Sequence, residues 1–149
     1  MGSSFYNLHI QVVFTTKYRK RTLIGDRKLL FARFESLLAM NDCIPLAVNG
    51  MEEHVHLFFK LGKKQSLVSV VRNVKAYSSK YISEEGLFPG FQGWQNGYAA
   101  FSYSRWDLEK MINYVNGQEE HHRKRTFEEE YLKLLDEEKL NYDLKYVFD

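Results

Sequence analysis

The sequence of 149 residues is poor in cysteine and proline, with one cysteine, Cys43, and two prolines. A single cysteine excludes a disulfide within the chain and a metal site built from several thiolates. Long apolar runs are also missing: no stretch can span a bilayer, and none has the pattern of a signal peptide. These absences predict a cytoplasmic protein with no membrane partner, in which Cys43 is a small residue of the core.

Charge of one sign is not in large excess either, because 21 basic and 19 acidic residues leave a net charge of +2. The charges are nevertheless unevenly placed. Basic side chains cluster at 17–21, 60–64 and 121–125, and acidic ones gather in the C-terminal third. This distribution indicates a basic surface beside an acidic tail, although any single cluster is more often a solvated face.

At this length the chain is expected to form one domain over residues 1–149, with a core at about 5–121 and a helical tail at about 122–149. Alternating apolar residues predict strands, and apolar residues at the helical period predict helices. The expected strands are 6–16, 43–49, 54–61 and 97–103, and the expected helices are 25–41, 66–84 and 105–121, with a partly helical stretch in 127–139.

This order, β-α-β-β-α-β, predicts an α+β fold of the ferredoxin-like type, in which an antiparallel sheet has two helices on one face and a further helix follows. The dipeptide Asn49-Gly50 is a turn signal that would join the second and third strands in a hairpin. Pro45 favours an edge position for the second strand, whereas the third is expected to be central. Ser104 and Asp107, three residues apart, form a capping-box pattern at the start of the last helix.

His54 and His56 stand two residues apart in the alternating run HVHLFFKL. The alternation places both imidazoles on the strand face opposite Val55 and Leu57, and we expect the histidine face to be the exposed one. Two imidazoles one pleat apart can share one metal ion, because the pleat fixes their directions. Two half-exposed histidines on an ordinary strand are the alternative, and the H-x-H pattern alone does not decide between them.

A second group of functional side chains lies on the predicted helix 105–121. Tyr114 and Gln118 are neighbours one turn apart on a flank outside the apolar stripe, and His121 continues their line. A tyrosine is a poor nucleophile at neutral pH, but a metal ion beside it would polarise a phosphate and neutralise developing charge. Gln118 can supply an oxygen ligand to a metal held by the two histidines. A solvated flank is the alternative for this group taken by itself.

With these motifs the sequence resembles the small single-tyrosine HUH transposases of bacterial insertion sequences, the IS200-like family. The matching segments are HVH within HVHLFFKL and the spacing from tyrosine to glutamine in INYVNGQEEHH, followed by a basic stretch. The order of elements also matches, and the resemblance extends over about residues 5–131.

The resemblance implies a DNA transposase that cleaves and rejoins single-stranded DNA, with hairpin ends of a mobile element as partner. Tyr114 would attack the scissile phosphodiester and form a 5′-phosphotyrosine link with a free 3′-OH, while His54, His56 and Gln118 would coordinate Mg²⁺ or Mn²⁺. Two imidazole ligands make Mn²⁺ a suitable alternative to the oxygen-preferring Mg²⁺. Family members are typically homodimers, and in many of them the tyrosine of one subunit works with the H-x-H pair of the other.

Basic side chains would contact the DNA backbone in a salt-dependent way. The candidates are Lys17, Arg19, Lys20, Arg21, His121, Arg123 and Lys124. Gln118 is preferred to His121 or His122 as the third metal ligand, because of its spacing from Tyr114 and because of the resemblance.

Two other functions fit the same sequence. A domesticated relative would act as a hairpin-specific nickase without moving an element; a replication-initiation or relaxase-type nickase is disfavoured because the sequence holds no helicase or partner domain. A non-enzymatic module for single-stranded nucleic acid would stack bases on aromatic side chains of the central strands, and of the third strand only Phe58 fits that pattern. Covalent chemistry through Tyr114 separates the enzyme from the binding module.

Overall fold

The computed structural model describes residues 2–149. Its strands form one antiparallel sheet in the order β2-β3-β1-β4, which confirms the predicted ferredoxin-like α+β fold and the central position of the H-x-H strand, β3. The strands are β1 (His9–Thr15), β2 (Ile44–Gly50), β3 (His54–Lys60) and β4 (Ala99–Tyr103). The helices are α1 (Lys28–Met40), α2 (Leu67–Glu85), α3 (Leu108–Asn116), α4 (Gln118–Lys124) and α5 (Phe127–Glu137), with short 3-10 turns η1 (Lys17–Arg19) and η2 (Arg105–Asp107).

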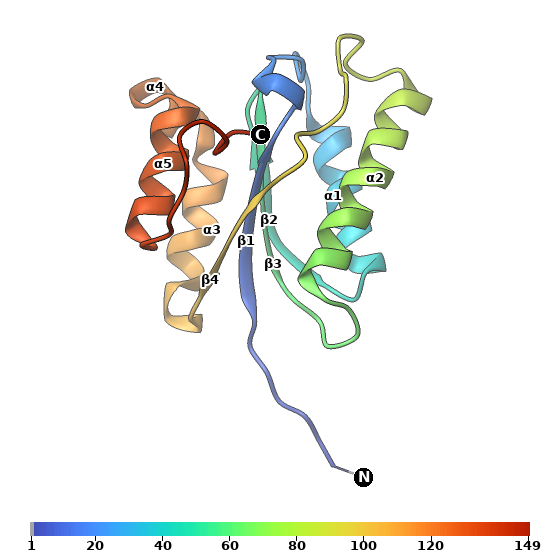
Figure 1. The fold of residues 1–149 in the computed structure, drawn as a ribbon. Helices are drawn as coiled ribbons and strands as arrows, with labels where there is room; N and C mark the ends of the chain where they lie inside the picture. Colours follow the sequence, from blue (N-terminus) through green and yellow to red (C-terminus); the bar gives the residue numbers. More distant parts are fainter. Residues whose placement is uncertain (1) are drawn as a thin grey trace.

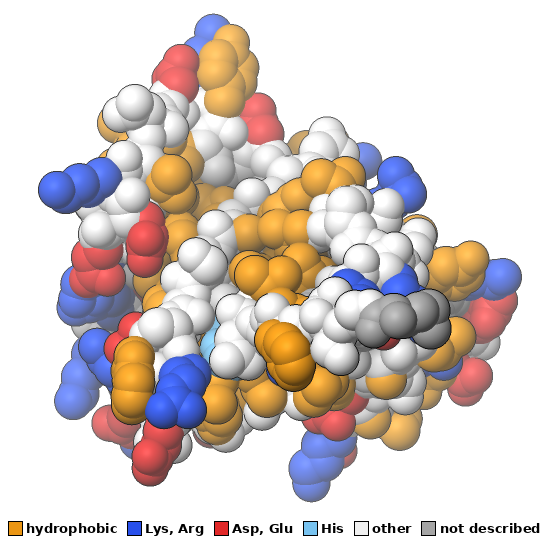
Figure 2. Space-filling view, turned by 90° about the horizontal axis from the view of Figure 1, so that it is seen from below, with side chains coloured by type: hydrophobic (Ala, Val, Ile, Leu, Met, Phe, Trp, Pro, Cys, Tyr) orange, Lys and Arg blue, Asp and Glu red, His pale blue; other side chains and the backbone are white. Residues whose placement is uncertain are grey.

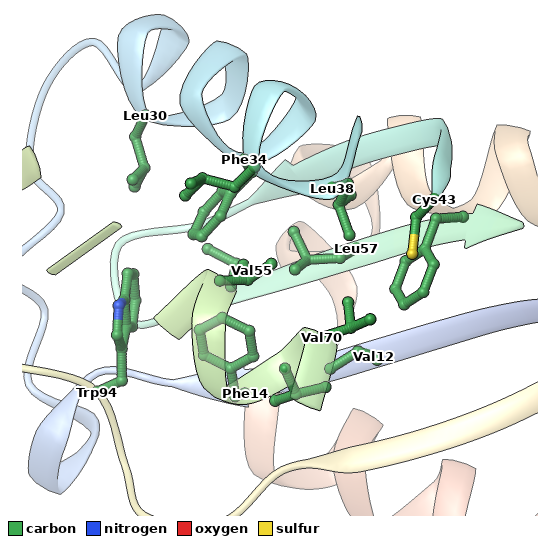
Figure 3. Close-up of a cluster of buried hydrophobic side chains, with 14 of the residues drawn as sticks. Val12, Phe14, Leu30, Phe34, Leu38, Cys43, Val55, Leu57, Val70 and Trp94 are labelled. Carbon is green, nitrogen blue, oxygen red and sulfur yellow. The ribbon is translucent and has the colours of Figure 1, made fainter. Parts of the chain in front are cut away.

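Helices lie on both faces of the sheet, with α1 and α2 on one face and α3, α4 and α5 on the other (Figure 1). Alternation along β3 sends Val55 and Leu57 into the first layer, where they pack with Phe34 of α1 and Val70 of α2. Figure 3 shows this core between the sheet and the two helices, with Cys43 at one end of it, as the sequence predicts. Burial of these branched and aromatic side chains is the main force that holds α1 and α2 on the sheet.

The other face of β3 carries His54, His56 and Phe58. The expectation that this face is exposed is wrong, because all three side chains are fully buried. Phe58 packs against Met111 and Val115 of α3, and α4 and α5 continue the cover toward the two histidines. Strand alternation predicts which side chains share a face, but it does not say whether a distant segment of the chain covers that face.

The predicted hairpin between β2 and β3 is present, but its turn lies later than expected. Asn49 and Gly50 belong to β2, where they pair with β3, and residues 51–53 form the turn. Pro45 lies on an edge strand, as predicted, next to a shift in register between Pro45 and Ala47.

Gly50 is required because the backbone of β3 lies close to it at the end of β2. A Cβ atom at this position would collide with the carbonyl oxygen of His54 and press on Val55. We therefore expect Gly50→Ala to lower the free energy of unfolding by about 1–3 kcal/mol, measured by urea denaturation. Gly90→Ala is the control, because its Cβ would make only an ordinary contact with Thr22. Equal denaturation midpoints for the two variants would contradict the prediction.

The predicted last helix is divided at two points. A 3-10 turn, η2, precedes α3, and Gly117, with φ −93° and ψ 21°, separates α3 from α4. Tyr114 and Gln118 therefore lie on either side of a break instead of along one regular helix. The predicted capping box forms only in part, since the Ser104 hydroxyl donates to the Asp107 carboxylate at 3.3 Å and does not cap the backbone.

The two ends of the sheet differ. The end at which β1 begins carries hydrophobic side chains across the middle of its surface (Figure 2). Phe5, Ile44 and Trp106 belong to segments at this end and are 91%, 57% and 80% exposed. His54 lies at the opposite end, where it pairs with the last residue of β1. Within residues 2–149, no helix combines the length and the apolar character needed to cross a membrane.

Candidate active site

Side chains from three elements meet over the histidine end of β3. His54 and His56 project from β3, Gln118 and His122 from α4, and Glu130 from α5. The pleat places the two β3 imidazoles on one face, and the four-residue spacing on α4 places Gln118 and His122 on one face of that helix. Four of the five side chains are buried and His122 is partly buried.

Five donor atoms of this cluster converge. The Oε1 atom of Gln118 lies 3.1 Å from Nε2 of His54 and 3.2 Å from Nε2 of His122. The Oε1 atom of Glu130 lies 3.2 Å from Nε2 of His56, 3.3 Å from that of His122 and 3.7 Å from that of His54. Neighbouring ligands at about 2.1 Å from an octahedral ion are separated by about 3 Å, so these spacings suit a divalent metal.

The cluster contains the donor types that such an ion takes. The three groups His54, His122 and Glu130 can each direct one ligand atom to a common point, since these atoms lie within 4.8 Å of one another. Imidazole nitrogens and carboxylate or amide oxygens together suit Mn²⁺ and related ions. This group overlaps the predicted ligands at His54 and adds two residues that were not predicted as ligands.

The other ring nitrogen of each β3 histidine is held by a buried partner. Nδ1 of His54 lies 2.6 Å from the Glu53 carboxylate, and Nδ1 of His56 lies 2.8 Å from Oε1 of Gln11. Gln11 donates through Nε2 to the Tyr103 hydroxyl, so its oxygen is the atom that accepts from His56. With a proton on each Nδ1, the lone pairs of both Nε2 atoms face the centre of the cluster. Partners that fix the ring and its tautomer in this way are the usual second layer of a metal site.

Tyr114 lies at the edge of the same cluster. Its hydroxyl donates a hydrogen bond to Oε2 of Glu130, and its ring meets His56 edge-on, with centroids 5.8 Å apart. His121 packs on the other side of the tyrosine ring, at 4.7 Å between centroids. All these contacts are made within one chain, so the tyrosine and the H-x-H pair lie together without a second copy.

Burial and neighbouring groups of the cluster shift the pKa values of Tyr114, Glu130 and His54. Burial, followed by the adjacent Glu130 carboxylate, raises the pKa of Tyr114 far above its usual range, so the phenol is neutral at physiological pH. Burial alone would raise the pKa of Glu130, but the neighbouring His56 and the hydrogen bond from His122 outweigh burial and hold that pKa well below its usual range. Burial lowers the pKa of His54, against the opposing effect of Glu53. A negative carboxylate therefore sits among imidazoles and beside a neutral phenol.

The structure brings four of the seven predicted DNA-binding residues to one cavity. Arg19, Arg21, Arg123 and Lys124 line a cavity of about 470 Å³ beside Glu53 and His122. Lys17 and Lys20 lie outside its lining, and His121 lines a different cavity together with Tyr114 and Lys124.

Three of the arginines in this cavity are paired with acidic side chains. Arg19 bonds Glu128 at 3.1 Å, and Arg123 bonds Glu120 at 3.0 Å. Arg21 lies 3.3 Å from Glu53, the partner of His54. The Arg19–Glu128 and Arg123–Glu120 pairs are at least partly exposed on both sides and so contribute little to stability, whereas in the third pair only Arg21 is exposed and Glu53 is buried. The exposed guanidinium groups remain available to other anions.

Sequence reasoning missed Glu130, Glu53 and Gln11, and it ranked His122 below Gln118. A signal existed for His122, which lies four residues after Gln118 and so on the same helical face. Glu130 gave no such signal, because it is the last of three consecutive glutamates and only the docking of α5 selects it.

Two solved structures share this fold, and both are described as transposases. One is a protein from Deinococcus radiodurans R1, provisionally described as a transposase, with a TM-score of 0.61 and 20% identity over 79% of this chain and 96% of that chain. The other is a REP-associated tyrosine transposase bound to a REP hairpin, with a TM-score of 0.56 and 16% identity over 82% of this chain and 74% of that chain. At these identities the likeness establishes a common fold.

The family is established by sequence. The family described as "Transposase IS200 like" matches residues 4–118, so the chain belongs to the IS200-like transposase family. None of the curated proteins matches the sequence. The family match includes both β3 histidines, Tyr114 and Gln118, and it ends before His122 and Glu130.

Proposed function

We propose that this protein is a transposase that cleaves and rejoins single-stranded DNA at element ends through a 5′-phosphotyrosine intermediate on Tyr114, with a divalent metal, Mg²⁺ or Mn²⁺. The observation that supports the proposal most directly is the contact between the Tyr114 hydroxyl and the Glu130 carboxylate, whose other oxygen faces His56 and His122. The candidate nucleophile and the candidate ligands are thus joined through one side chain.

In the cleavage step, a bond forms between the Tyr114 phenol oxygen and the scissile phosphorus while the bond from phosphorus to the 3′ oxygen breaks. The phenol proton is released to solvent, and the departing 3′ oxygen takes up a proton to become the 3′-OH. Rejoining reverses these changes, since a 3′-OH attacks the phosphotyrosine and the phenol is restored. One phosphodiester is exchanged for another, so no external energy source is needed.

His54, His56 and Gln118 would hold the metal, and His122 and Glu130 have donor atoms in the same cluster. When bound, the ion supplies Lewis-acid polarisation of the phosphate and neutralises charge that develops there. Glu53 and Gln11 keep the β3 imidazoles in one orientation, and burial of the cluster limits competing attack by water.

Single-stranded DNA with hairpin ends is the partner we propose, and a homodimer is the form we propose for the active protein. The basic cavity beside Glu53 and His122 supports a DNA backbone that runs toward the cluster. A solved structure with the same fold holds a REP hairpin. The family resemblance supports the homodimer.

The experiment that tests this function is a search for a covalent adduct. The protein is incubated with labelled single-stranded DNA from both flanks of its gene and with Mn²⁺, and the products are separated on a denaturing gel. We expect a protein–DNA adduct that disappears when a chelator replaces Mn²⁺ and returns when the ion is restored in excess. Digestion and mass spectrometry should place the DNA on the peptide that contains Tyr114. An adduct on another residue, or one that persists in chelator, would contradict the proposal.

A further inference from the structure

Glu130 occupies a position between the candidate ligands and the candidate nucleophile. We propose that it is a catalytic residue: one carboxylate oxygen is a metal ligand and the other holds the Tyr114 hydroxyl in place. This inference rests on the proposed function and adds to it a residue that lies beyond the matched segment 4–118.

The two oxygens of this carboxylate face different groups. Oε1 lies 3.2 Å from Nε2 of His56 and 3.3 Å from Nε2 of His122. Oε2 accepts the hydrogen bond of the Tyr114 hydroxyl and lies 3.5 Å from Nε2 of Gln118. A carboxylate that held a metal through one oxygen and the hydroxyl through the other would fix the separation of the two.

The backbone around Glu130 is held firmly enough for this task. Thr126 caps the N-terminus of helix α5, and its hydroxyl accepts from the amide of Glu129 at 3.2 Å. On the face of α5 that meets the sheet, Phe127 and Tyr131 flank Glu130 in sequence and pack in a cluster with Val13. Only 4% of Glu130 is exposed. The position of the carboxylate therefore follows from the packing of α5 on the sheet.

Burial of this group needs a compensating interaction. A buried carboxylate loses its hydration, and this loss is offset only when cations or strong donors surround it. Glu130 has imidazoles on one side and a phenol on the other, whereas its neighbour Glu129 is exposed and Glu128 pairs with Arg19 on the surface. Of the three consecutive glutamates, Glu130 alone faces the cluster, which indicates a role that a surface charge does not have.

The consequence for the reaction is one of orientation. Attack on phosphorus requires the phenol oxygen to be placed within a narrow range of directions, and misplacement by about 1 Å can lower the rate about 100-fold. The ring of Tyr114 is held by His56 and His121, but ring packing leaves the hydroxyl hydrogen free to rotate. The bond to Oε2 removes that freedom and links the hydroxyl to the ligand cluster.

The test uses Glu130→Gln, which keeps the size of the side chain and removes its charge, with Glu129→Gln as the matched control one residue away. We expect Glu130→Gln to bind Mn²⁺ at least about tenfold more weakly, as followed by electron paramagnetic resonance of the full chain without DNA. We expect adduct formation to be slowed at least about 100-fold. Glu129→Gln should match the wild type in both measurements. Circular dichroism checks the fold, and Glu130→Asp, which retains the charge, should recover part of the Mn²⁺ affinity.

Two results would overturn the proposal. If Glu130→Gln binds Mn²⁺ and forms adduct as the wild type does, the carboxylate has no catalytic role. If it forms adduct faster than the wild type, Glu130 blocks the site and α5 is a cover. The Mn²⁺ measurement does not depend on DNA cleavage, so it tests Glu130 as a ligand even if the wild type forms no adduct. If Glu130→Gln forms normal adduct on Tyr114, only the inference about Glu130 fails and the proposed function stands.

Discussion

Replacement of Tyr114 by phenylalanine is expected to abolish the covalent adduct and to slow DNA cleavage by a factor of about 10⁴ or more, as loss of a nucleophile does in other enzymes. The substitution removes one oxygen atom and keeps the ring that packs between His56 and His121. Binding of Mn²⁺ and of single-stranded DNA should therefore be retained. The measurement is a single-turnover time course on labelled DNA, read on a denaturing gel.

Tyr131→Phe is the matched control, because Tyr131 is also a buried tyrosine, its ring packs with Phe127 and Phe148, and it is not one of the five residues of the ligand cluster. Burial raises the pKa of Tyr131 to about 12, so this substitution, like Tyr114→Phe, removes a neutral phenol. It should form adduct at the rate of the wild type. An adduct in Tyr114→Phe of normal yield would move the nucleophile to another residue. Normal DNA binding with no adduct in any variant, the wild type included, would favour the non-enzymatic binding module.

The sequence predicts those parts of this fold that depend on local patterns. Alternation in HVHLFFKL gives both the strand and the pairing of His54 with His56 on one face. Pro45 predicts the edge position of β2, and the apolar stripe of 66–84 predicts α2 within one residue at each end. Each of these features is encoded within one stretch of chain shorter than twenty residues.

The features that the sequence does not predict depend on contacts between distant segments. Burial of His54 and His56 follows from the docking of α3, α4 and α5, and nothing in the strand itself records that cover. Glycine is tolerated inside many helices, so the presence of Gly117 in the sequence does not by itself reveal the break between α3 and α4. Glu130 is distinguished from its two neighbours only by the face of α5 that meets the sheet.

In the candidate site, too, the local features are predicted from the sequence and the contacts between distant segments are not. The spacing of Tyr114 and Gln118 points to both residues, and the structure brings Gln118 within 3.1 Å of His54. The partners of the imidazoles come from the neighbouring strand and from the turn before β3, at Gln11 and Glu53. A motif search finds the candidate nucleophile and candidate ligands, whereas the side chains that would orient them are recognised only from the packed fold.

Substitution of His56 should distinguish the role of the metal ligands from the role of the nucleophile. We expect His56→Ala to lose measurable Mn²⁺ binding and adduct formation, while Tyr114 remains present. The imidazole is fully buried, with Nδ1 bonded to Gln11 and Nε2 at 3.2 Å from Glu130. Its removal leaves the buried amide oxygen of Gln11 without its donor, so the free energy of unfolding should also fall by about 1–3 kcal/mol.

His9→Ala is the control for that variant, because His9 is a buried histidine on β1 that pairs with Lys60 at the far end of β3. It should lose some stability and keep its affinity for Mn²⁺. If His56→Ala and His9→Ala bind Mn²⁺ equally well, the ion is held elsewhere. The converging side chains then serve only as hydrogen-bond partners for one another. If His56→Ala alone loses the ion while Tyr114→Phe keeps it, ligand and nucleophile are independent parts of one site. Glu130 is then the side chain that connects them, because it is in contact with both.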